Sequence, residues 1–317
     1  MTTNAAAPTA GDIPAIEFDG LSKSYDSGVL ALDSLTLTVP RGEIFGFLGP
    51  NGAGKSTTLR LMLDLLRPTS GSVRVFGQDC NDGTWNVRSR VGYLPGDLTV
   101  YPNMTVRDSI DLFSSLRPGA VRPEYVVQLC DRLMLDVTKR NRELSHGNRQ
   151  KVGVVLAVMA EAELIILDEP TNALDPLMQR EVLEILRQVR EQGSTVFFSS
   201  HNLPEVERIC DRVGMIREGK LVAVERVEEV ISQRLTVVVV RFEDPVPEGR
   251  FASLDGVTET FRNNGGREVH LEVSGDMDAL IKAIAQHRVV SLESAPPSLE
   301  EAFMSLYEHG AKAGGNE

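Results

Sequence analysis

The chain has 317 residues, of which 42% are hydrophobic and 25% charged, and its formal net charge is −12. This length favours two domains, or one large domain with an appendage, and the composition is ordinary for a globular protein. The negative charge argues against duplex nucleic acid as a partner, because clustered Lys and Arg bind such partners.

Cysteine usage and hydropathy indicate the compartment. Cys80, Cys130 and Cys210 are scattered without disulfide or zinc spacing, so we expect free thiols in a reducing compartment. No apolar run approaches the roughly 20 residues of a membrane span, and the N-terminus lacks the basic and apolar regions of a secretory signal. We therefore expect a cytoplasmic protein that reaches a membrane only through a partner chain. Residues 1–14, rich in Ala, Thr and Pro, are expected to be disordered.

The first predicted strands precede a glycine-rich stretch. Strands are indicated at Ile16 to Phe18 and by the alternation of Leu35, Leu37 and Val39. Tyr25 lies on a loop between them. Its ring could stack on a nucleotide base, although spacing alone favours an ordinary loop tyrosine.

The stretch from Gly49 to Thr57 fits the phosphate-binding pattern G-x-x-x-x-G-K-[ST]. A buried strand is predicted before it, at Ile44 to Leu48, and a helix after it, as far as Leu66. Its glycines let backbone N–H groups close around phosphate oxygens, and the helix N-terminus adds about half a positive charge. Lys55 can reach the β- and γ-phosphates, and Ser56 can ligate Mg²⁺. The candidate nucleotide-binding residues here are Gly49, Asn51, Gly52, Gly54, Lys55, Ser56 and Thr57. A turn that binds nothing is the alternative, which the rest of the chain disfavours.

The middle of the chain alternates strand and helix patterns. Strands are predicted at Val73 to Gly77 and Val91 to Leu94, and an interrupted helical insertion from Val106 to about Met134. Ser145 is a predicted N-cap of the next helix, so Ser145 and Gly147 lie at its positive end. On its own, a simple capped helix explains this pattern.

Two carboxylates follow the most apolar strand. Leu164 to Leu167 predicts a central parallel strand, and Asp168 and Glu169 follow at its carboxyl end, where ligands bind in open α/β sheets. Asp168 is the expected Mg²⁺ ligand, and Glu169 could polarise an attacking water. The alternative is a solvated acidic turn. The next buried strand, Thr195 to Phe198, leads to His201 at the same sheet edge, which favours a functional histidine over a structural one.

The remaining elements complete one domain and build a second. A short helix from Glu205 to Cys210 and a hairpin over Val213 to Val224 close the first domain. Further strands and helices are predicted at Thr236 to Phe242, Val257 to Phe261, Val269 to Val273, Asp276 to Gln286, and from a capping box at Ser298 to about Glu308. This small α+β domain carries no recognisable chemistry, and the tail 311–317 is expected to be flexible.

In this order the motifs resemble those of an ABC-type ATPase, the nucleotide-binding subunit of an ABC transporter, over about Ile16 to Glu225. Gly49 to Thr57 resembles the Walker A motif, Leu144 to Gln150 the LSGGQ signature, and Leu164 to Glu169 the Walker B motif. Ala173 to Asp175 resembles the D-loop, His201 the switch histidine and Tyr25 the adenine-stacking aromatic.

The resemblance implies an α/β P-loop NTPase with a RecA-like core, a helical subdomain around 97–160 and an antiparallel β subdomain near the N-terminus. The expected domains are the ATPase at 15–230 and a small C-terminal α+β accessory domain at 231–310. ATP and Mg²⁺ are the implied ligands. The resemblance implies that Glu169 and His201 are catalytic and that Ser56 and Asp168 bind the metal. It also implies that Ser145, Gly147 and Asp175 contact the nucleotide.

The family also implies partners. These are a separate transmembrane permease at the cytoplasmic face of the membrane and a second copy of the chain, which forms a homodimer around ATP; no nucleic acid is expected. Residues 93–97 and 297–303 resemble the drug- and antibiotic-exporter subgroup. An importer subunit and a soluble ABC ATPase acting on ribosomes or DNA are the alternatives. Such soluble factors usually carry two cassettes, whereas this chain has one phosphate loop.

Two residues depart from the family pattern. His146 replaces the first glycine of the signature, where its side chain is expected to crowd the γ-phosphate bound by the partner subunit. Gly96 stands where the family usually has the Q-loop glutamine, which leaves Asp97 or water as a substitute.

Overall fold

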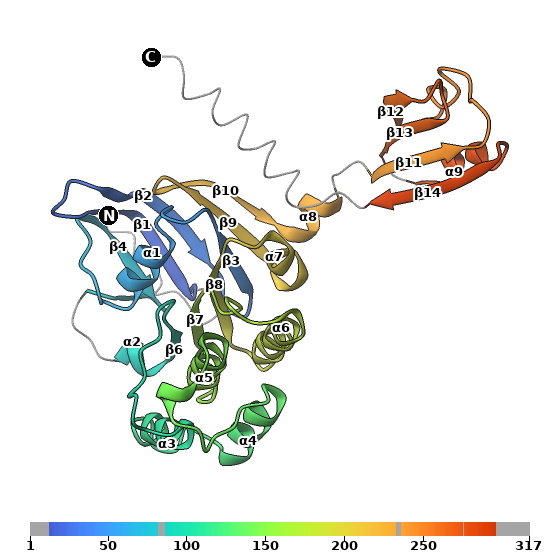
Figure 1. The fold of residues 1–317 in the computed structure, drawn as a ribbon. Helices are drawn as coiled ribbons and strands as arrows, with labels where there is room; N and C mark the ends of the chain where they lie inside the picture. The colour runs from blue at the N-terminus through green and yellow to red at the C-terminus, as the bar shows by residue number, and fades with distance from the viewer. Residues whose placement is uncertain (1–12, 82–85, 233–235, 275, 296–317) are drawn as a thin grey trace, which may run out of the picture. The chain divides into compact units, whose positions relative to one another are not determined.

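The computed structural model describes residues 13–81, 86–232, 236–274 and 276–295. The chain divides into two compact units, Met1–Glu225 and Arg226–Glu317, each described by itself (Figure 1). Of the N-terminal segment predicted to be disordered, only Ile13 and Pro14 are described, and the Ile13 carbonyl accepts a hydrogen bond from Arg41 Nε at 3.0 Å. The helix predicted from Ser298 and the tail 311–317 lie outside the described residues.

The first unit contains an antiparallel sheet with the strand order β2-β1-β4-β5. Its strands are β1 (Ile16–Ser24), β2 (Leu30–Val39), β4 (Ser70–Val75) and β5 (Gln78–Asp79). Ile16 is paired with Val39 on one side and with Val75 on the other. The antiparallel β subdomain expected near the N-terminus is therefore present.

A six-stranded sheet forms the centre of the unit, with the order β10-β9-β3-β8-β7-β6. Its strands are β3 (Ile44–Leu48), β6 (Val91–Leu94), β7 (Leu164–Asp168), β8 (Thr195–Ser200), β9 (Arg212–Arg217) and β10 (Lys220–Arg226). Every residue of β3, β7 and β8 is buried, which explains their nearly continuous apolar runs. The predicted hairpin is also part of this sheet, because β9 pairs in parallel with β3.

The two sheets pack against each other through aromatic side chains. The Phe197 ring of β8 stacks on Phe45 of β3 at 5.5 Å and lies 6.4 Å from Phe18 of β1. Helix α1 (Lys55–Met62) joins the same core. The other face of the central sheet carries α5 (His146–Val158), α6 (Pro176–Glu191) and α7 (Leu203–Ile209) (Figure 1). Helix α7 lies so close that a Cβ at Gly46 of β3 would be 2.8 Å from Cys210 Sγ.

The short helices follow local signals. Helices α2 (Asn86–Ser89), α3 (Val106–Ser115) and α4 (Pro123–Arg132) and the 3₁₀ turn Asn141–Glu143 lie between β5 and α5. Thr105 caps α3 with a capping box, and Pro123 occupies the first turn of α4, so the predicted interruption is confirmed. Helix α1 was predicted to reach Leu66 but ends at Met62, because Asp64 takes a left-handed conformation with φ 55°.

The second unit contains one antiparallel sheet, in the order β12-β13-β11-β14. Its elements are α8 (Val227–Ser232), β11 (Thr236–Phe242), β12 (Val257–Asn263), β13 (Glu268–Val273), α9 (Asp278–Ile284) and β14 (Val289–Ala295). Leu280 and Ile284 of α9 pack on the buried valines of β11. Strand β14 was not predicted from the sequence. No helix in the described parts of either unit is long and apolar enough to cross a membrane.

Candidate nucleotide-binding site

A cavity of about 710 Å³ opens where the carboxyl ends of β3, β7 and β8 meet. This edge is the general ligand-binding position of open α/β sheets, and the volume is that of a small-molecule pocket. Most of the candidate residues line it: Tyr25, Asn51, Gly52, Gly54, Lys55, Ser56, Thr57, Asp168, Glu169 and His201. Segments more than 100 residues apart in the sequence thus meet at one site.

The start of α1 presents a buried cation to this cavity. Gly54 precedes the helix with φ 109°, and a Cβ there would lie 2.5 Å from the Ala31 carbonyl oxygen, so only glycine fits. The Lys55 side chain is 6% exposed. Its Nζ donates to the Gly49 carbonyl at 2.6 Å and lies 3.3 Å from Glu169 Oε1. A helix N-terminus and a buried ammonium together suit a bound polyphosphate.

Tyr25 lies at the same cavity with its hydroxyl held. Its Oη and Thr57 Oγ1 are 3.2 Å apart, and Lys23 Nζ lies 5.6 Å from the ring centroid. The Tyr25 hydroxyl therefore anchors the ring to Thr57, the last residue of the phosphate-binding stretch. Stacking on adenine stays a prediction.

Asp168 ends β7 and is almost fully buried, at 4% exposure. Its Oδ1 accepts a hydrogen bond from Ser199 Oγ on β8 at 2.5 Å. On its other side a Cβ at Gly96 would lie 3.0 Å from Asp168 Oδ2, so the departure at Gly96 places bare backbone beside this carboxylate. Burial, and secondly the charge of Asp168, raises the pKa of nearby Tyr93.

The donor set suits Mg²⁺ held jointly with a substrate. The described residues contain no group of three or more His, Cys, Asp or Glu that could hold a metal by themselves. Ser56 and Asp168 line the cavity with one hydroxyl and one carboxylate. Mg²⁺ is commonly held by one or two carboxylates together with substrate phosphates and water, so these residues fit it.

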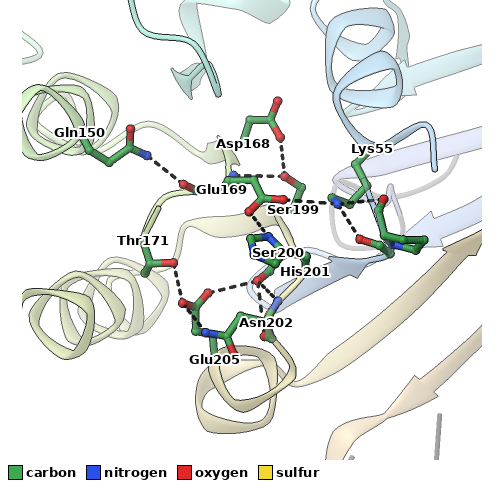
Figure 2. Close-up of polar contacts among 12 residues, drawn as sticks. Lys55, Gln150, Asp168, Glu169, Thr171, Ser199, Ser200, His201, Asn202 and Glu205 are labelled. Carbon is green, nitrogen blue, oxygen red and sulfur yellow. Dashed lines mark hydrogen bonds and ion pairs between the residues drawn. The ribbon is translucent and has the colours of Figure 1, made fainter. Parts of the chain in front are cut away.

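Glu169 has a strained backbone, and its carboxylate contacts a lysine and a histidine side chain. Its φ is 53°, a left-handed value that costs a non-glycine residue about 1–3 kcal/mol. Its N–H donates to the carbonyl and the hydroxyl of Ser199, and its carbonyl accepts from Gln150 Nε2 at 2.8 Å. The carboxylate contacts Lys55 through one oxygen and His201 Nδ1 through the other, as Figure 2 shows. This arrangement holds the carboxylate inside the cavity.

The sequence predictions did not include Gln150, which donates to the Glu169 backbone carbonyl, or Ser199, which bonds the Asp168 carboxylate and the Glu169 N–H. Gln150 had a signal, because it ends the signature stretch. Ser199 was visible only as a hydroxyl residue at the end of an apolar strand, which is a weak signal.

The remaining candidates do not line this cavity. Ser145 caps α5, where its Oγ accepts from Asn148 N at 3.2 Å, so the predicted N-cap is confirmed. Asp175 caps α6 by accepting from Leu177 N at 3.0 Å. Gly147 packs closely, because a Cβ there would lie 2.6 Å from the Ala173 carbonyl oxygen. Their nucleotide contacts stay predictions.

His146, which departs from the signature motif, and Asp97, the expected substitute for the Q-loop glutamine, lie together at a second cavity. His146 and Asp97 line a smaller cavity of about 260 Å³, with Arg142 and Arg149. Asp97 lines the larger cavity as well. The expected crowding by His146 concerns a second subunit and stays a prediction.

Comparisons with known proteins identify relatives of this chain. The family description "ABC transporter" matches residues 32–172. An ABC transporter ATP-binding protein of Synechocystis is 34% identical over 307 residues, which cover 92% of this chain and 84% of the relative. The bacitracin transport ATP-binding protein BcrA of Enterococcus faecalis is 37% identical over 218 residues, which cover 68% of this chain and 70% of the relative.

Solved structures show the same fold. The dimeric structure of MJ0796, described as a bacterial ABC transporter cassette, matches with a TM-score of 0.62. The match covers 67% of this chain and 98% of that one, at 24% sequence identity.

Proposed function

Since the chain belongs to the ABC transporter ATP-binding proteins, we propose that it energises an exporter that expels drugs or other hydrophobic compounds through a separate membrane permease. ATP binding and hydrolysis follow from the family. The direction of transport and the class of compound are the proposal. The bacitracin-transporting relative supports it, as does the resemblance of residues 93–97 to the exporter subgroup.

The observation that carries the hydrolytic part of this function is the contact of Glu169 with both Lys55 and His201 inside the cavity. ATP enters with its phosphates toward Lys55 and the start of α1. Ser56 and Asp168 hold Mg²⁺, which when bound neutralises part of the phosphate charge.

The side chains around Glu169 then exchange partners. The γ-phosphate attracts the Lys55 ammonium and competes with Glu169 for it, because both are anions. Released from Lys55, the Glu169 carboxylate accepts a proton from the attacking water. The water oxygen bonds to the γ-phosphorus as the bond from that phosphorus to ADP breaks, so ADP and phosphate leave. His201 lies within reach of the same carboxylate and donates to the γ-phosphate oxygen.

A second copy of the chain completes the site. Ser145 and Gly147 lie at the N-terminus of α5, outside the cavity that contains Lys55. A helix N-terminus favours an anion in front of it. Two copies that face each other head-to-tail bring each phosphate loop opposite the other's α5. The structurally similar cassette MJ0796 is described as dimeric, which supports an assembly of two chains.

Export is tested with the permease recovered by affinity purification of the tagged chain. Inside-out vesicles that contain both proteins should accumulate a hydrophobic drug when ATP is added outside, and Lys55→Ala vesicles should not, because the cation that binds the phosphates is gone. Calorimetric titration of Lys55→Ala with ATP checks that binding is the step lost. Drug release from preloaded inside-out vesicles on ATP addition would indicate import, and co-purification of ribosomes without a membrane protein would contradict any transport role.

A further inference from the structure

A third carboxylate lies beneath the pair formed by Glu169 and His201. Glu205 of α7 is only 7% exposed, and no ion pair to it occurs within the described part of the chain. Its Oε1 accepts from Thr171 Oγ1 at 2.7 Å and from Asn202 Nδ2 at 3.0 Å. Its Oε2 accepts from Ser200 Oγ at 3.1 Å (Figure 2). A buried carboxylate is costly, so three neutral donors are the means by which this one is retained.

These three donors come from two different segments. Ser200 and Asn202 are the residues on either side of His201, at the end of β8. Thr171 follows Glu169 by two positions, is itself buried, and begins the loop that leads to Asp175. One carboxylate therefore joins the chain around His201 to the loop beyond Glu169.

A purely local role at the start of α7 does not explain this arrangement. The Asn202 side chain accepts no capping hydrogen bond from α7, and its amide donates to Glu205 instead. The contact with Thr171 spans 34 residues and satisfies no backbone group of that helix. A cavity of about 90 Å³, lined by Glu169, Thr171, His201 and Glu205, lies beside it, so the loop has room to shift when the link is lost.

We propose that Glu205 is a positioning residue for hydrolysis, which holds His201 and the loop from Thr171 to Asp175 in fixed relation to Glu169. This inference rests on the proposed roles of Glu169 and His201. Glu205 reaches the reaction only through other residues, so its loss should slow turnover and leave ATP binding intact. Misplacement of catalytic groups by about 1 Å can cost up to about 100-fold in rate.

The primary test compares Glu205→Ala with Glu205→Gln. Alanine removes all three contacts, and we expect kcat to fall by about 10- to 100-fold while KM and the Kd for MgATP change by less than about 2-fold. Glutamine can keep accepting from Thr171 and Asn202 through its carbonyl oxygen while its amide donates to the Ser200 hydroxyl, so it should restore most of kcat. Glu207→Ala, on the same helix, is the matched control and should leave kcat unchanged.

A double-mutant cycle identifies the contact that matters. Thr171→Val should lower kcat, and Thr171→Ser, which keeps the hydroxyl, should restore it. The double variant Thr171→Val with Glu205→Ala should be no slower than Glu205→Ala alone, because each substitution removes the same hydrogen bond between Thr171 and Glu205. Val206→Ala loosens the buried side of α7 without touching the network. If Val206→Ala reproduces the loss of kcat, if the Thr171 and Glu205 effects add, or if Glu205→Ala turns over normally, the proposal is wrong.

Glu169→Gln is measured in the same series. A normal rate in that variant overturns the proposed role of Glu169 and the positioning role with it. A slow Glu169→Gln beside a normal Glu205→Ala overturns the positioning role alone.

Discussion

Glu169 combines a strained backbone with the carboxylate on which the proposed chemistry depends. Its left-handed conformation is held by hydrogen bonds to both its N–H and its carbonyl from residues of other elements. Strain of this kind persists where surrounding contacts over-determine it, commonly at functional sites. The side chain thereby projects into the cavity, between Lys55 and His201.

The strain is measurable with a matched pair of variants. Glu169→Ala and Glu169→Gly both lose the carboxylate, but only glycine adopts φ 53° without a steric penalty. We expect the glycine variant to be more stable than the alanine variant by about 1 kcal/mol in urea unfolding. Equal stabilities, or a more stable alanine variant, would show that the left-handed conformation is not strained. Both variants should lose ATPase activity.

The three cysteines are buried and free, and their environments suppress reactivity. Burial, followed by the charges of Asp79 and Asp64, raises the pKa of Cys80 to about 12. Burial likewise raises the pKa of Cys130 and, more strongly, that of Cys210. A native chain at pH 8 should therefore react with a thiol-specific disulfide reagent far more slowly than the chain in urea.

The same shift sets a pH dependence of stability. The folded-state pKa of Cys80 is raised above its usual 9.0. The contribution of the protonated thiol to the free energy of unfolding is therefore complete below about pH 9 and is lost as the pH rises toward about 12. Cys80→Ala should flatten the fall in unfolding free energy over this window. Rapid labelling of native Cys80 at pH 8 would contradict the burial argument.

At the scale of elements, the start of α5 contacts the loop that follows Glu169. Gly147 lies against the Ala173 carbonyl, and Gln150 of the same helix binds the Glu169 carbonyl. Helix α5 therefore contacts this loop at two points, so a displacement of the helix should also displace Glu169.

Two neighbouring substitutions separate packing from crowding. Gly147→Ala places a methyl group against the backbone of Ala173, and we expect a loss of about 1–3 kcal/mol in unfolding free energy and slower ATP hydrolysis. His146 is exposed, so the loss of its side-chain contacts in His146→Gly should change the unfolding free energy by no more than about 0.5 kcal/mol. The lower helix propensity of glycine adds to that loss. ATPase activity should be unchanged or higher. A collapse of activity in His146→Gly would show that this histidine is itself a contact in the assembly.

At the scale of the whole molecule, the described cavity contains only part of the expected site. Lys55 and Asp168 line it, whereas Ser145 and Gly147, at the start of α5, do not. The proposed composite site of two chains would remove this separation and make ATP part of the interface.

The dimer is tested by slowing its dissociation. Glu169→Gln lacks the proposed base, and loss of a general base typically costs about 10²- to 10⁴-fold in rate. We expect this variant to bind MgATP and accumulate as a closed dimer, detected by light scattering as a doubling of mass for the chain alone, or as a second ATPase copy on the permease. The matched variant Lys55→Ala with Glu169→Gln should stay monomeric. One ATPase copy per assembly with ATP bound would contradict the composite site.

The sequence by itself determined the elements whose signals are local. The loop after β3 needs its glycines and lysine at fixed spacing, and the buried strands β3, β7 and β8 need continuous apolar runs, so the order of strand, loop and helix and the three strands were predicted correctly. The N-cap at Ser145 and the break before Pro123 follow from single residues. Lys55, Glu169 and His201 were predicted to lie together because each comes after the end of a parallel strand, and the carboxyl ends of parallel strands meet at one edge of the sheet.

Only the tertiary structure decided the contacts between distant segments. The pairing of β9 with β3 and the addition of β14 to the second sheet depend on neighbours remote in sequence. Glu205 was unremarkable in the sequence, as one glutamate of a short helix. Its three hydrogen-bond partners are brought together by folding, because a buried carboxylate is specified by the donors around it, and one of those donors, Thr171, is 34 residues away in the sequence.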